Sequence, residues 1–493
     1  MKYISTRDAK NTVSATYAIA TGLARDGGLF VPSGLPQITA RDIDRFRTAD
    51  YKRRFIETAA GFSDEFSEYE LSDFAEKAYG ENFASTNPAP VRRIDENTAF
   101  LELWHGPTCA FKDMALQMLP LLLTASLKKC GETRKVCVAV ATSGDTGKAA
   151  LEGFRDVDGT SVIVFYPRDG VSEVQKLQMV TQEGENVFVC AVNGNFDDAQ
   201  RGVKDIFSDP VFAKFLSEKG YMLSSANSIN WGRLMPQIAY YISAYCDCMN
   251  SGMIGPGEKI NFCVPTGNFG NILAGWYAKR MGLPVNRFIC ASNRNNILTD
   301  FINTGIYDVN RPFYTTASPS MDILVSGNLE RLLYGLCGDS DEISGYMNDL
   351  KQKGVYKVSQ EMKETINNEF SGGFCDDFDT KHTIAELWEK NGYLTDTHTA
   401  VAYRVLEDYR ANTNDSTAAV VLSTASPFKF CEDVSDALGG NTGNGEDPVE
   451  ALAALTGQKP PAPLRGLSKK KPRFTDHVDK KDMKNAVSGF LFQ

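Results

Sequence analysis

The feature that most restricts the fold of this chain is a regular alternation of short apolar runs and longer amphipathic runs. Between residues 133 and 206 it predicts three strand–helix pairs: Val136–Ala141 with Lys148–Phe154, Val162–Tyr166 with Ser172–Val180, and Val187–Val192 with Asp197–Ile206. A second alternating stretch comprises Ile260–Val264, Ile272–Met281 and Phe288–Ala291, and a late strand is predicted at Ala418–Leu422. Apolar strands separated by helices favour an α/β fold in which parallel sheets are covered on both faces.

In open α/β sheets, ligands gather beyond the carboxyl ends of the strands. Three loops of this chain, as well as Thr424, follow predicted strands and are rich in small polar residues or carry a lysine. We therefore expect these segments to meet at one site.

The first of these loops contains Lys112. It follows the apolar run Ala99–Leu103 and a Gly-Pro turn, and it precedes a predicted helix, Met114–Leu122. Because a charged amine is costly to bury among apolar neighbours such as Phe111, we expect the pKa of Lys112 to fall. A neutral amine is the form that condenses with an aldehyde cofactor. Taken alone the signal is weak, since most lysines beside a helix start are surface residues.

The second loop, Pro265–Asn271, joins a predicted strand to a predicted helix. Gly267 and Gly270 allow consecutive backbone N–H groups to turn inward, and the helix N-terminus adds a partial positive charge, which together favour a phosphate cradle. An ordinary glycine turn has the same composition. No Gly-Lys-Ser/Thr follows and no G-x-G-x-x-G is present, so the loop is neither a P-loop nor a dinucleotide fingerprint.

The third loop, Ala141–Gly147, also precedes a predicted helix. Its small hydroxyl residues and glycines suit an anionic group of a substrate. An equally good reading is a plain helix cap, with Ser143, Asp145 or Thr146 as the capping residue.

Together these segments resemble the threonine synthase family. The similar stretches are His105–Asp113, Ser143–Gly147 and Gly267–Asn271, and further ones are Gly22–Pro32, Asn227–Arg233, Pro319–Leu324, His398–Val401 and Leu422–Ala425. The resemblance covers roughly residues 5 to 435, and the order of so many motifs makes chance an unlikely explanation. One departure lies in the last motif, where the family has S-T-A-H-P-A-K-F and this chain has Ser426 and Phe428 in place of the histidine and the second alanine.

The resemblance implies a pyridoxal-phosphate dependent enzyme of fold type II, with parallel sheets flanked by helices in two lobes and a helical N-terminal domain. It implies that Lys112 carries pyridoxal 5'-phosphate and acts as the catalytic base and acid. The cofactor phosphate would be held by Gly267, Asn268, Phe269, Gly270 and Asn271, with Thr424 facing the pyridine nitrogen. Phe111 is better explained as a core residue than as a wall of the cofactor site.

The implied reaction converts O-phospho-L-homoserine and water to L-threonine and phosphate by γ-elimination and β-addition of water. Our candidates for binding the substrate's carboxylate and phosphate are Ser143, Asp145, Thr146, Asn227, Asn230 and Arg233. A guanidinium suits a phosphate because it can donate two parallel hydrogen bonds. A structural or surface salt bridge explains Arg233 about equally well.

Two alternatives remain open from sequence. A phospho-lyase on the same scaffold would release 2-oxobutyrate, because the two activities differ only in whether water adds after phosphate leaves. A non-catalytic relative is a different class, although the presence of Lys112 argues against it. A nicotinamide enzyme is disfavoured because no Rossmann fingerprint follows a first strand.

The bulk composition restricts partners and location. With 52 basic and 62 acidic residues the net charge is −10, which argues against nucleic acid or an anionic membrane as a partner. The eleven cysteines have no paired metal spacing, the four histidines are scattered, and we expect no metal site. No run approaches the roughly 20 apolar residues of a membrane span. These features are typical of a cytoplasmic protein that acts on a small molecule; its oligomeric state is left open.

The length of 493 residues predicts two or three domains. We expect an N-terminal domain at 1–92, a small mobile α/β domain at 133–244, and a large cofactor-binding domain formed by 93–132 and 245–493. Within the large domain, 338–396 is predicted as a helical insert and the chain after about 439 as loop or flexible tail.

Overall fold

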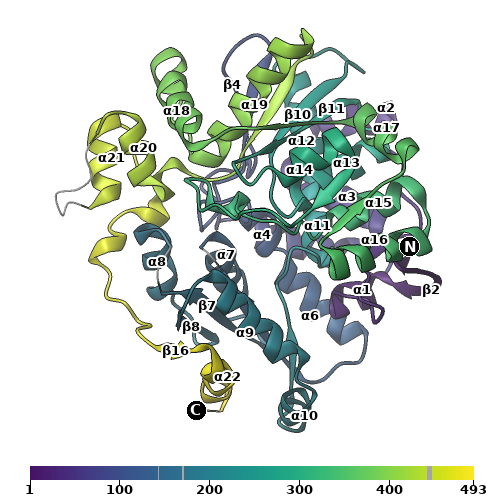
Figure 1. Ribbon diagram of the computed structural model, residues 1–493, viewed down its shortest axis with the longest axis vertical. Coiled ribbons are helices and arrows are strands. Elements are labelled where there is room, and N and C mark those ends of the chain that lie inside the picture. Colours follow the sequence, from purple (N-terminus) through teal and green to yellow (C-terminus); the bar gives the residue numbers. More distant parts are fainter. Residues whose placement is uncertain (143, 169–170, 441–446, 493) are drawn as a thin grey trace.

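Two parallel sheets organise the computed structural model, which describes residues 1–142, 144–168, 171–440 and 447–492 (Figure 1). The larger sheet has the strand order β14-β11-β10-β15-β5-β4, and β4 alone runs antiparallel to its neighbour. Its strands are β4 (Val91–Arg93), β5 (Thr98–Glu102), β10 (Ile260–Pro265), β11 (Val285–Ser292), β14 (Phe370–Phe374) and β15 (Ala419–Ser423).

The smaller sheet has the order β16-β8-β7-β6-β9, with every neighbouring pair parallel. Its strands are β6 (Lys135–Ala141), β7 (Thr160–Pro167), β8 (Val187–Asn193), β9 (Tyr221–Ser224) and β16 (His477–Asp479). The predicted strands of both sheets are therefore confirmed to within a few residues.

Both sheets are buried on both faces, as near-continuous apolar strands require. In β10, Phe262 and Val264 belong to one apolar cluster while Cys263 belongs to the cluster on the opposite face. In β6, Val138 and Ala139 divide in the same way between two other clusters.

Helices cover these faces. Those that flank the smaller sheet are α7 (Asp145–Phe154), α8 (Glu173–Val180), α9 (Phe196–Ser208), α10 (Pro210–Glu218) and α22 (Met483–Leu491). Those of the larger lobe are α12 (Ile238–Asn250), α13 (Gly270–Met281), α14 (Ile297–Thr304), α15 (Leu329–Cys337), α16 (Ser340–Lys353), α17 (Gln360–Glu369), α18 (Asp377–Asn391), α19 (Thr397–Thr413), α20 (Cys431–Ala437) and α21 (Pro448–Thr456). A two-stranded antiparallel sheet of β12 (Ile306–Asp308) and β13 (Val355–Lys357) lies beside α14.

The first ninety residues contain more strand than the sequence predicts. A three-stranded antiparallel sheet, β1 (Lys2–Ser5), β2 (Asp8–Ser14) and β3 (Phe30–Pro32), accompanies α1 (Ala15–Thr21), α2 (Ala40–Thr48), α3 (Tyr51–Phe62) and α4 (Glu68–Tyr79). These elements share one core with the large lobe, because the ring of Tyr3 packs edge-on against Trp231 at 5.5 Å between centroids.

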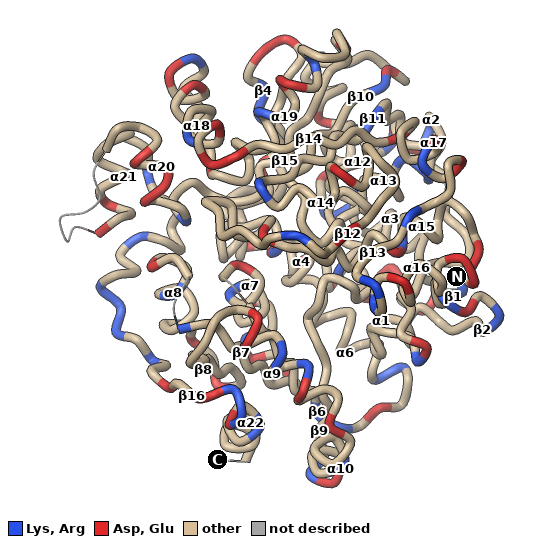
Figure 2. Tube along the Cα trace, in the orientation of Figure 1, with Lys and Arg blue, Asp and Glu red and all other residues tan. Residues whose placement is uncertain are grey.

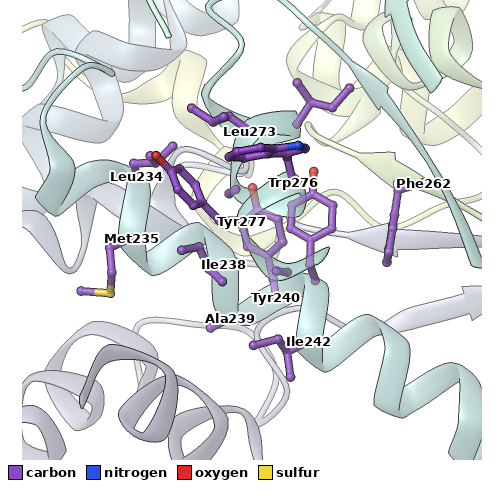
Figure 3. Packing of buried hydrophobic residues seen from close by; sticks show 14 of the residues in the cluster. Leu234, Met235, Ile238, Ala239, Tyr240, Ile242, Phe262, Leu273, Trp276 and Tyr277 are labelled. Carbon is purple, nitrogen blue, oxygen red and sulfur yellow. The ribbon is translucent and has the colours of Figure 1, made fainter. Parts of the chain in front are cut away.

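The middle of that shared core is the segment made of α11 (Trp231–Leu234), a 3₁₀ turn η1 (Met235–Gln237) and α12 (Figure 3). Side chains such as Ile238 and Tyr240 lie close to Trp276 and Tyr277 of α13 in Figure 3, with Phe262 of β10 nearby. Because α12 also packs on α2 and α3, this segment joins the N-terminal region to the larger sheet.

Three sequence expectations need correction. The predicted helix Met114–Leu122 is two helices, α5 (Asp113–Leu116) and α6 (Leu119–Lys129), with Pro120 in the first turn of the second helix. The region 338–396 is not a purely helical insert, because its strand β14 pairs with β11 in the larger sheet. The chain after 439 contains α21, and its final part adds β16 and α22 to the smaller sheet.

Lysine, arginine, aspartate and glutamate are interspersed along the outer elements in Figure 2. No helix in the described part of the chain is both long and apolar enough to cross a membrane.

The close packing of α7 against α5, where the two lobes meet, can be tested by mutation. A Cβ atom on Gly153 would lie 1.9 Å from the carbonyl oxygen of Leu116. We expect Gly153→Ala to lower the free energy of unfolding by about 2 kcal/mol, since overpacking forces the backbone apart. As a matched control, Gly345→Ala lies in α16 with open space around it and should raise that free energy by roughly 0.5–1 kcal/mol. Denaturant unfolding of both variants measures the difference, and equal effects would contradict the close approach.

Candidate active site

All the sequence-predicted site residues that the structure describes line one cavity of about 1130 Å³. They come from the loops and first helical turns that follow strands of both sheets, and from α11 with the segment before it: Lys112, Asp145, Thr146, Asn227, Asn230, Arg233, Gly267, Asn268, Phe269, Gly270, Asn271 and Thr424. Ser143 lies outside the described residues. Phe111 also lines the cavity, so it is not the pure core residue that the sequence favours.

The loop that carries Lys112 is fixed to the strand end that carries Thr424. Ala110 and Ala425 form a β-bridge, and the N–H of Phe111 donates to the carbonyl of Thr424 at 2.8 Å. Beside Lys112, Asp113 is fully buried and accepts hydrogen bonds from the backbone N–H (2.8 Å) and the hydroxyl (2.6 Å) of Thr108. Burial raises the pKa of Asp113 to about 6, although the bonds from Thr108 lower it.

The loop before Lys112 needs a glycine at position 106 for a steric reason. A Cβ atom at Gly106 would lie 2.5 Å from a carboxylate oxygen of Asp113, so only glycine leaves room for the turn to wrap around that side chain. The Gly-Pro-Thr sequence thus builds the turn that holds the start of α5.

The amine of Lys112 is buried and makes two polar contacts. Its Nζ lies 3.0 Å from the hydroxyl of Ser320, in the 3₁₀ turn η2 (Pro319–Met321), and 3.3 Å from Oδ2 of Asp145. Burial lowers the pKa of Lys112 below its ordinary value, although the carboxylate of Asp145 opposes the shift. The predicted direction of the shift therefore agrees with the structure, and its main cause is desolvation.

Asp145 differs from our expectation that it contacts a substrate anion. Its Oδ1 lies 2.8 Å from Nζ of Lys429 and accepts a hydrogen bond from Gln175 at 2.8 Å, while its Oδ2 faces Lys112. Burial alone would raise the pKa of Asp145, but the charges of Lys429 and Lys112 hold it well below its usual range. Because a carboxylate repels anions, we assign Asp145 to the two lysines instead.

The loop after β10 forms a cradle of backbone donors. Among the described residues, the N–H groups of residues 267–271, at the N-terminus of α13, donate no hydrogen bond to any group outside that helix. Phe269 has a left-handed backbone with φ of 62°, while its ring packs in the core against Phe370. Free N–H groups at a helix start bind phosphate well, and Phe269 can contribute only its backbone.

Two neighbours hold this cradle in place. Asn328 donates from its backbone (3.1 Å) and from its side chain (3.0 Å) to the carbonyl of Asn268. The buried Arg331 in turn donates to the side chain of Asn328 at 2.6 Å and to the carbonyl of Phe30 at 3.0 Å. The carbonyl of Asn268 is thereby directed away from the donors.

Asn271 and Thr424 present uncommitted polar atoms. Oδ1 of Asn271 accepts from the hydroxyls of Tyr240 (2.6 Å) and Tyr241 (2.9 Å), which leaves its buried Nδ2 without an acceptor in the described part of the chain. The backbone of Thr424 is engaged with Phe111 and Thr399, and its hydroxyl has no recorded protein partner among the described residues. Both groups suit a polar ligand.

Arg233 is a buried cation of the cavity with one hydrogen-bond acceptor among the described residues. It is buried and donates to the carbonyl of Ala226 at 2.6 Å, and no carboxylate of the described residues forms an ion pair with it. Burial lowers its pKa to about 10, so the group remains charged at neutral pH. An unpaired buried guanidinium favours an anionic ligand over the structural salt bridge that the sequence left open.

The remaining candidates contribute less directly. The amide of Asn230 caps α11 through the N–H of Gly232 and donates to the carbonyl of Ile19 at 2.9 Å, so both of its ends are used within the protein. Asn227 is exposed and Thr146 half-buried, and both side chains line the cavity.

Sequence reasoning assigned no role to four residues that support Lys112. Ser320 contacts the amine, its backbone N–H donates to Nε2 of His398 at 3.1 Å, and Nδ1 of His398 pairs with Asp396 at 2.9 Å. Lys429 is the fourth. Its position between Phe428 and Phe430 carries the same signal of a buried amine that singled out Lys112.

Comparisons with known proteins match this geometry. Three family profiles cover the chain: "Threonine synthase N terminus" at residues 2–79, "Pyridoxal-phosphate dependent enzyme" at 88–424 and "Threonine synthase, C-terminal" at 399–487. Threonine synthase of Pseudomonas aeruginosa is 40% identical over 89% of this chain and 90% of that protein. The chain belongs to the threonine synthase family of pyridoxal-phosphate dependent enzymes.

Solved structures agree with this placement. A PLP-bound threonine synthase from Brucella melitensis superposes with a TM-score of 0.89 at 37% identity, covering all of both chains. The yeast threonine synthase structure has a TM-score of 0.90 at 33% identity, covering 99% of this chain and 98% of that one. Threonine synthase-like 1 of Homo sapiens is 40% identical over 88% of this chain, which spans only 60% of the length of that relative.

The donors of this cavity fit pyridoxal phosphate. The free N–H groups of residues 267–271 suit its phosphate, the buried amine of Lys112 suits its aldehyde, and Nδ2 of Asn271 and the hydroxyl of Thr424 remain available for polar atoms of the ring.

The cradle can be tested through Gly267. A Cβ atom there would lie 2.7 Å from the backbone carbonyl of Ser320, so a side chain must displace either the cradle or the turn beside Lys112. We expect Gly267→Val to weaken pyridoxal-phosphate binding at least about tenfold, which corresponds to about 1.4 kcal/mol. Absorbance titration of the cofactor into the apoprotein measures the affinity. Gly34→Val, at a site with open space, is the control, and equal affinities in the two variants would show that the loop is only a turn.

Proposed function

We propose that this protein converts O-phospho-L-homoserine and water to L-threonine and phosphate. One observation carries the proposal: a buried lysine, a phosphate cradle and an arginine with which no carboxylate of the described residues pairs line the same cavity. The first two suit the cofactor of the family, and the arginine supplies a second anion site for a phosphorylated substrate.

Each residue has a role that follows from its surroundings. Bound pyridoxal phosphate supplies a conjugated electron sink that acidifies the carbons near the substrate amine. The cradle at residues 267–271 holds the cofactor phosphate. The hydroxyl of Thr424 is neutral and so does not force the ring nitrogen to be protonated, as an aspartate would.

Lys112 moves protons. Its buried amine is poised toward the neutral form, so it can accept a proton from Cα of the substrate and later return it. Ser320 and Asp145 hold Nζ from two sides, which restricts the amine to the part of the cavity where the reacting carbons would lie. The low exposure of Lys112 (7%) keeps bulk water away from this amine.

Arg233 binds the leaving phosphate in this proposal. Its charge is buried, and the part of the chain that the structure describes offers it no carboxylate partner, so a dianionic phosphate gains a charge-assisted contact with little competition. Thr146 and Asn227, which also line the cavity, offer further polar contacts to the substrate. The position of Ser143 in the same motif makes it a candidate for the substrate's carboxylate.

A second candidate reaction is the phospho-lyase that yields 2-oxobutyrate. The relatives named threonine synthase, such as that of Pseudomonas aeruginosa at 40% identity over 89% of this chain, favour threonine over this alternative. Both reactions need the same lysine and the same phosphate site, and only the fate of the carbon skeleton after phosphate release distinguishes them.

We also propose that the protein works in a reducing compartment such as the cytoplasm. All eleven of its cysteines are free thiols, and nine of them are buried.

The reaction is tested by NMR of the products formed from O-phospho-L-homoserine. We expect threonine as the main product, with turnover reduced roughly 10³-fold or more in Lys112→Ala because the general base is lost. Lys128→Ala, an exposed residue of α6, is the control. Mostly 2-oxobutyrate would favour the phospho-lyase. Phosphate release at the wild-type rate from Lys112→Ala would contradict the assignment of the lysine.

The phosphate site is tested separately. We expect Arg233→Met to raise KM for O-phospho-L-homoserine roughly 30-fold or more, because a charge-assisted hydrogen bond is worth about 2 kcal/mol or more. Inhibition by inorganic phosphate should weaken in parallel. Arg294→Met, at an exposed residue that stacks on Tyr314 outside the cavity, should leave both constants unchanged. An unchanged phosphate inhibition in Arg233→Met would place the phosphate elsewhere.

A further inference from the structure

Lys429 is a buried lysine that the proposed mechanism does not use. It is fully excluded from solvent and is not among the residues that line the cavity. It lies in the 3₁₀ turn η3 (Pro427–Lys429), directly after the strand end that carries Thr424. A buried ammonium needs strong partners to offset its desolvation, so its contacts identify what it does.

The amine of Lys429 contacts both parts of the site that surround Lys112. Nζ donates to the carbonyl of Thr108 at 2.8 Å, in the turn that holds Asp113, and lies 2.8 Å from Oδ1 of Asp145. The other oxygen of Asp145 faces Lys112. One carboxylate from α7, in the lobe of the smaller sheet, therefore bridges two lysines of the larger lobe.

We propose that Lys429 is a positioning residue that holds Asp145 against Lys112 and, by sharing its carboxylate, keeps the amine of Lys112 available as a base. This role rests on the proposed function of Lys112. Without Lys429, the whole charge of Asp145 would act on Lys112 and would stabilise its protonated form. With Lys429 in place, the carboxylate is divided between the two amines.

The charges around the cluster agree with this direction. The positive charge of Lys429 lowers the pKa of Lys112, as does that of Arg233, while Asp145 raises it. The other titratable groups near the cluster are Asp113, Lys148, Glu152, Cys109 and, through Ser320, His398. Cys109 stays neutral because burial raises its pKa to about 12, and Lys148 is paired with Glu152 at 2.9 Å.

The test compares Lys429→Met with Lys429→Arg. In the apoprotein of the full chain, carbamylation of Lys112 by cyanate requires the neutral amine, and peptide mass spectrometry gives its rate against pH. We expect Lys429→Met to move the midpoint upward by about one pH unit, so that the rate well below the midpoint falls about tenfold. Lys429→Arg keeps the charge and should stay near the wild type.

The holoenzyme provides a second reading. In Lys429→Met, the acid limb of the profile of kcat against pH should move to higher pH. KM for the substrate should change far less than kcat. Asp145→Asn should move the pH midpoint of Lys112 carbamylation downward. When Lys429→Met is added to Asp145→Asn, it should shift this midpoint by less than half as much as it does in the wild type. If the methionine variant does not fold, Lys429→Gln can keep the bond to Thr108 and carries the same expectation.

The control is Lys279→Met, which removes a half-buried lysine paired with Glu369 at 3.5 Å and lies outside the cavity. It should leave the Lys112 midpoint in place. The inference is overturned if Lys429→Met lowers thermal stability but leaves the Lys112 midpoint and the acid limb unchanged, because Lys429 would then be only structural. Since cyanate labelling needs no turnover, it remains informative even if the product proves to be 2-oxobutyrate.

Discussion

The burial of one amine is the constraint on which the site depends. Lys112 can be held in a cavity between the lobes only if other groups compensate for the lost hydration of its charged form. Asp145 from α7 provides the countercharge, and Ser320 provides a neutral acceptor. Since the countercharge comes from the lobe of the smaller sheet and the lysine from the larger one, the protonation of Lys112 is tied to how the two lobes meet.

The cradle also provides polar groups for a buried charge, here with backbone N–H groups in place of side chains. Within the described ranges, the N–H groups of residues 267–271 have no acceptor outside α13, since the carbonyl of Asn268 is bound by Asn328 and Phe269 adopts a left-handed backbone. A phenylalanine tolerates that conformation poorly, so the burial of its ring in the core compensates for the strain. The anion site is therefore organised by apolar packing and by the buried guanidinium of Arg331, at a distance from the donors themselves.

The alternation of apolar and amphipathic runs predicted both parallel sheets, since period and burial are local properties of a sequence. It failed where an element depends on distant partners. β14 contains Ser371, Gly372 and Gly373 and has little strand propensity, yet it pairs with β11 because that edge of the sheet is open to it. β16 adds to β8 from the far end of the chain for the same reason. Pro120 marks the break in the predicted helix at 114–122, where a second helix begins.

The candidate site, like the fold, was predicted from the sequence only in part. Residue type and loop position singled out Lys112 and the loop at 267–271 and placed Thr424 at a strand end, because glycines, a lysine among apolar residues and strand ends are visible in the sequence. Arg233 was a candidate through the resemblance to the family. The partner of each charge was not visible. Asp145 in a helix start reads as a cap or a substrate ligand, and only the fold brings Lys429, far along the chain, within 2.8 Å of it. Coulomb interactions act through space and not along the chain, so the sequence by itself determined which groups can do chemistry, and the tertiary structure decided which of them face one another.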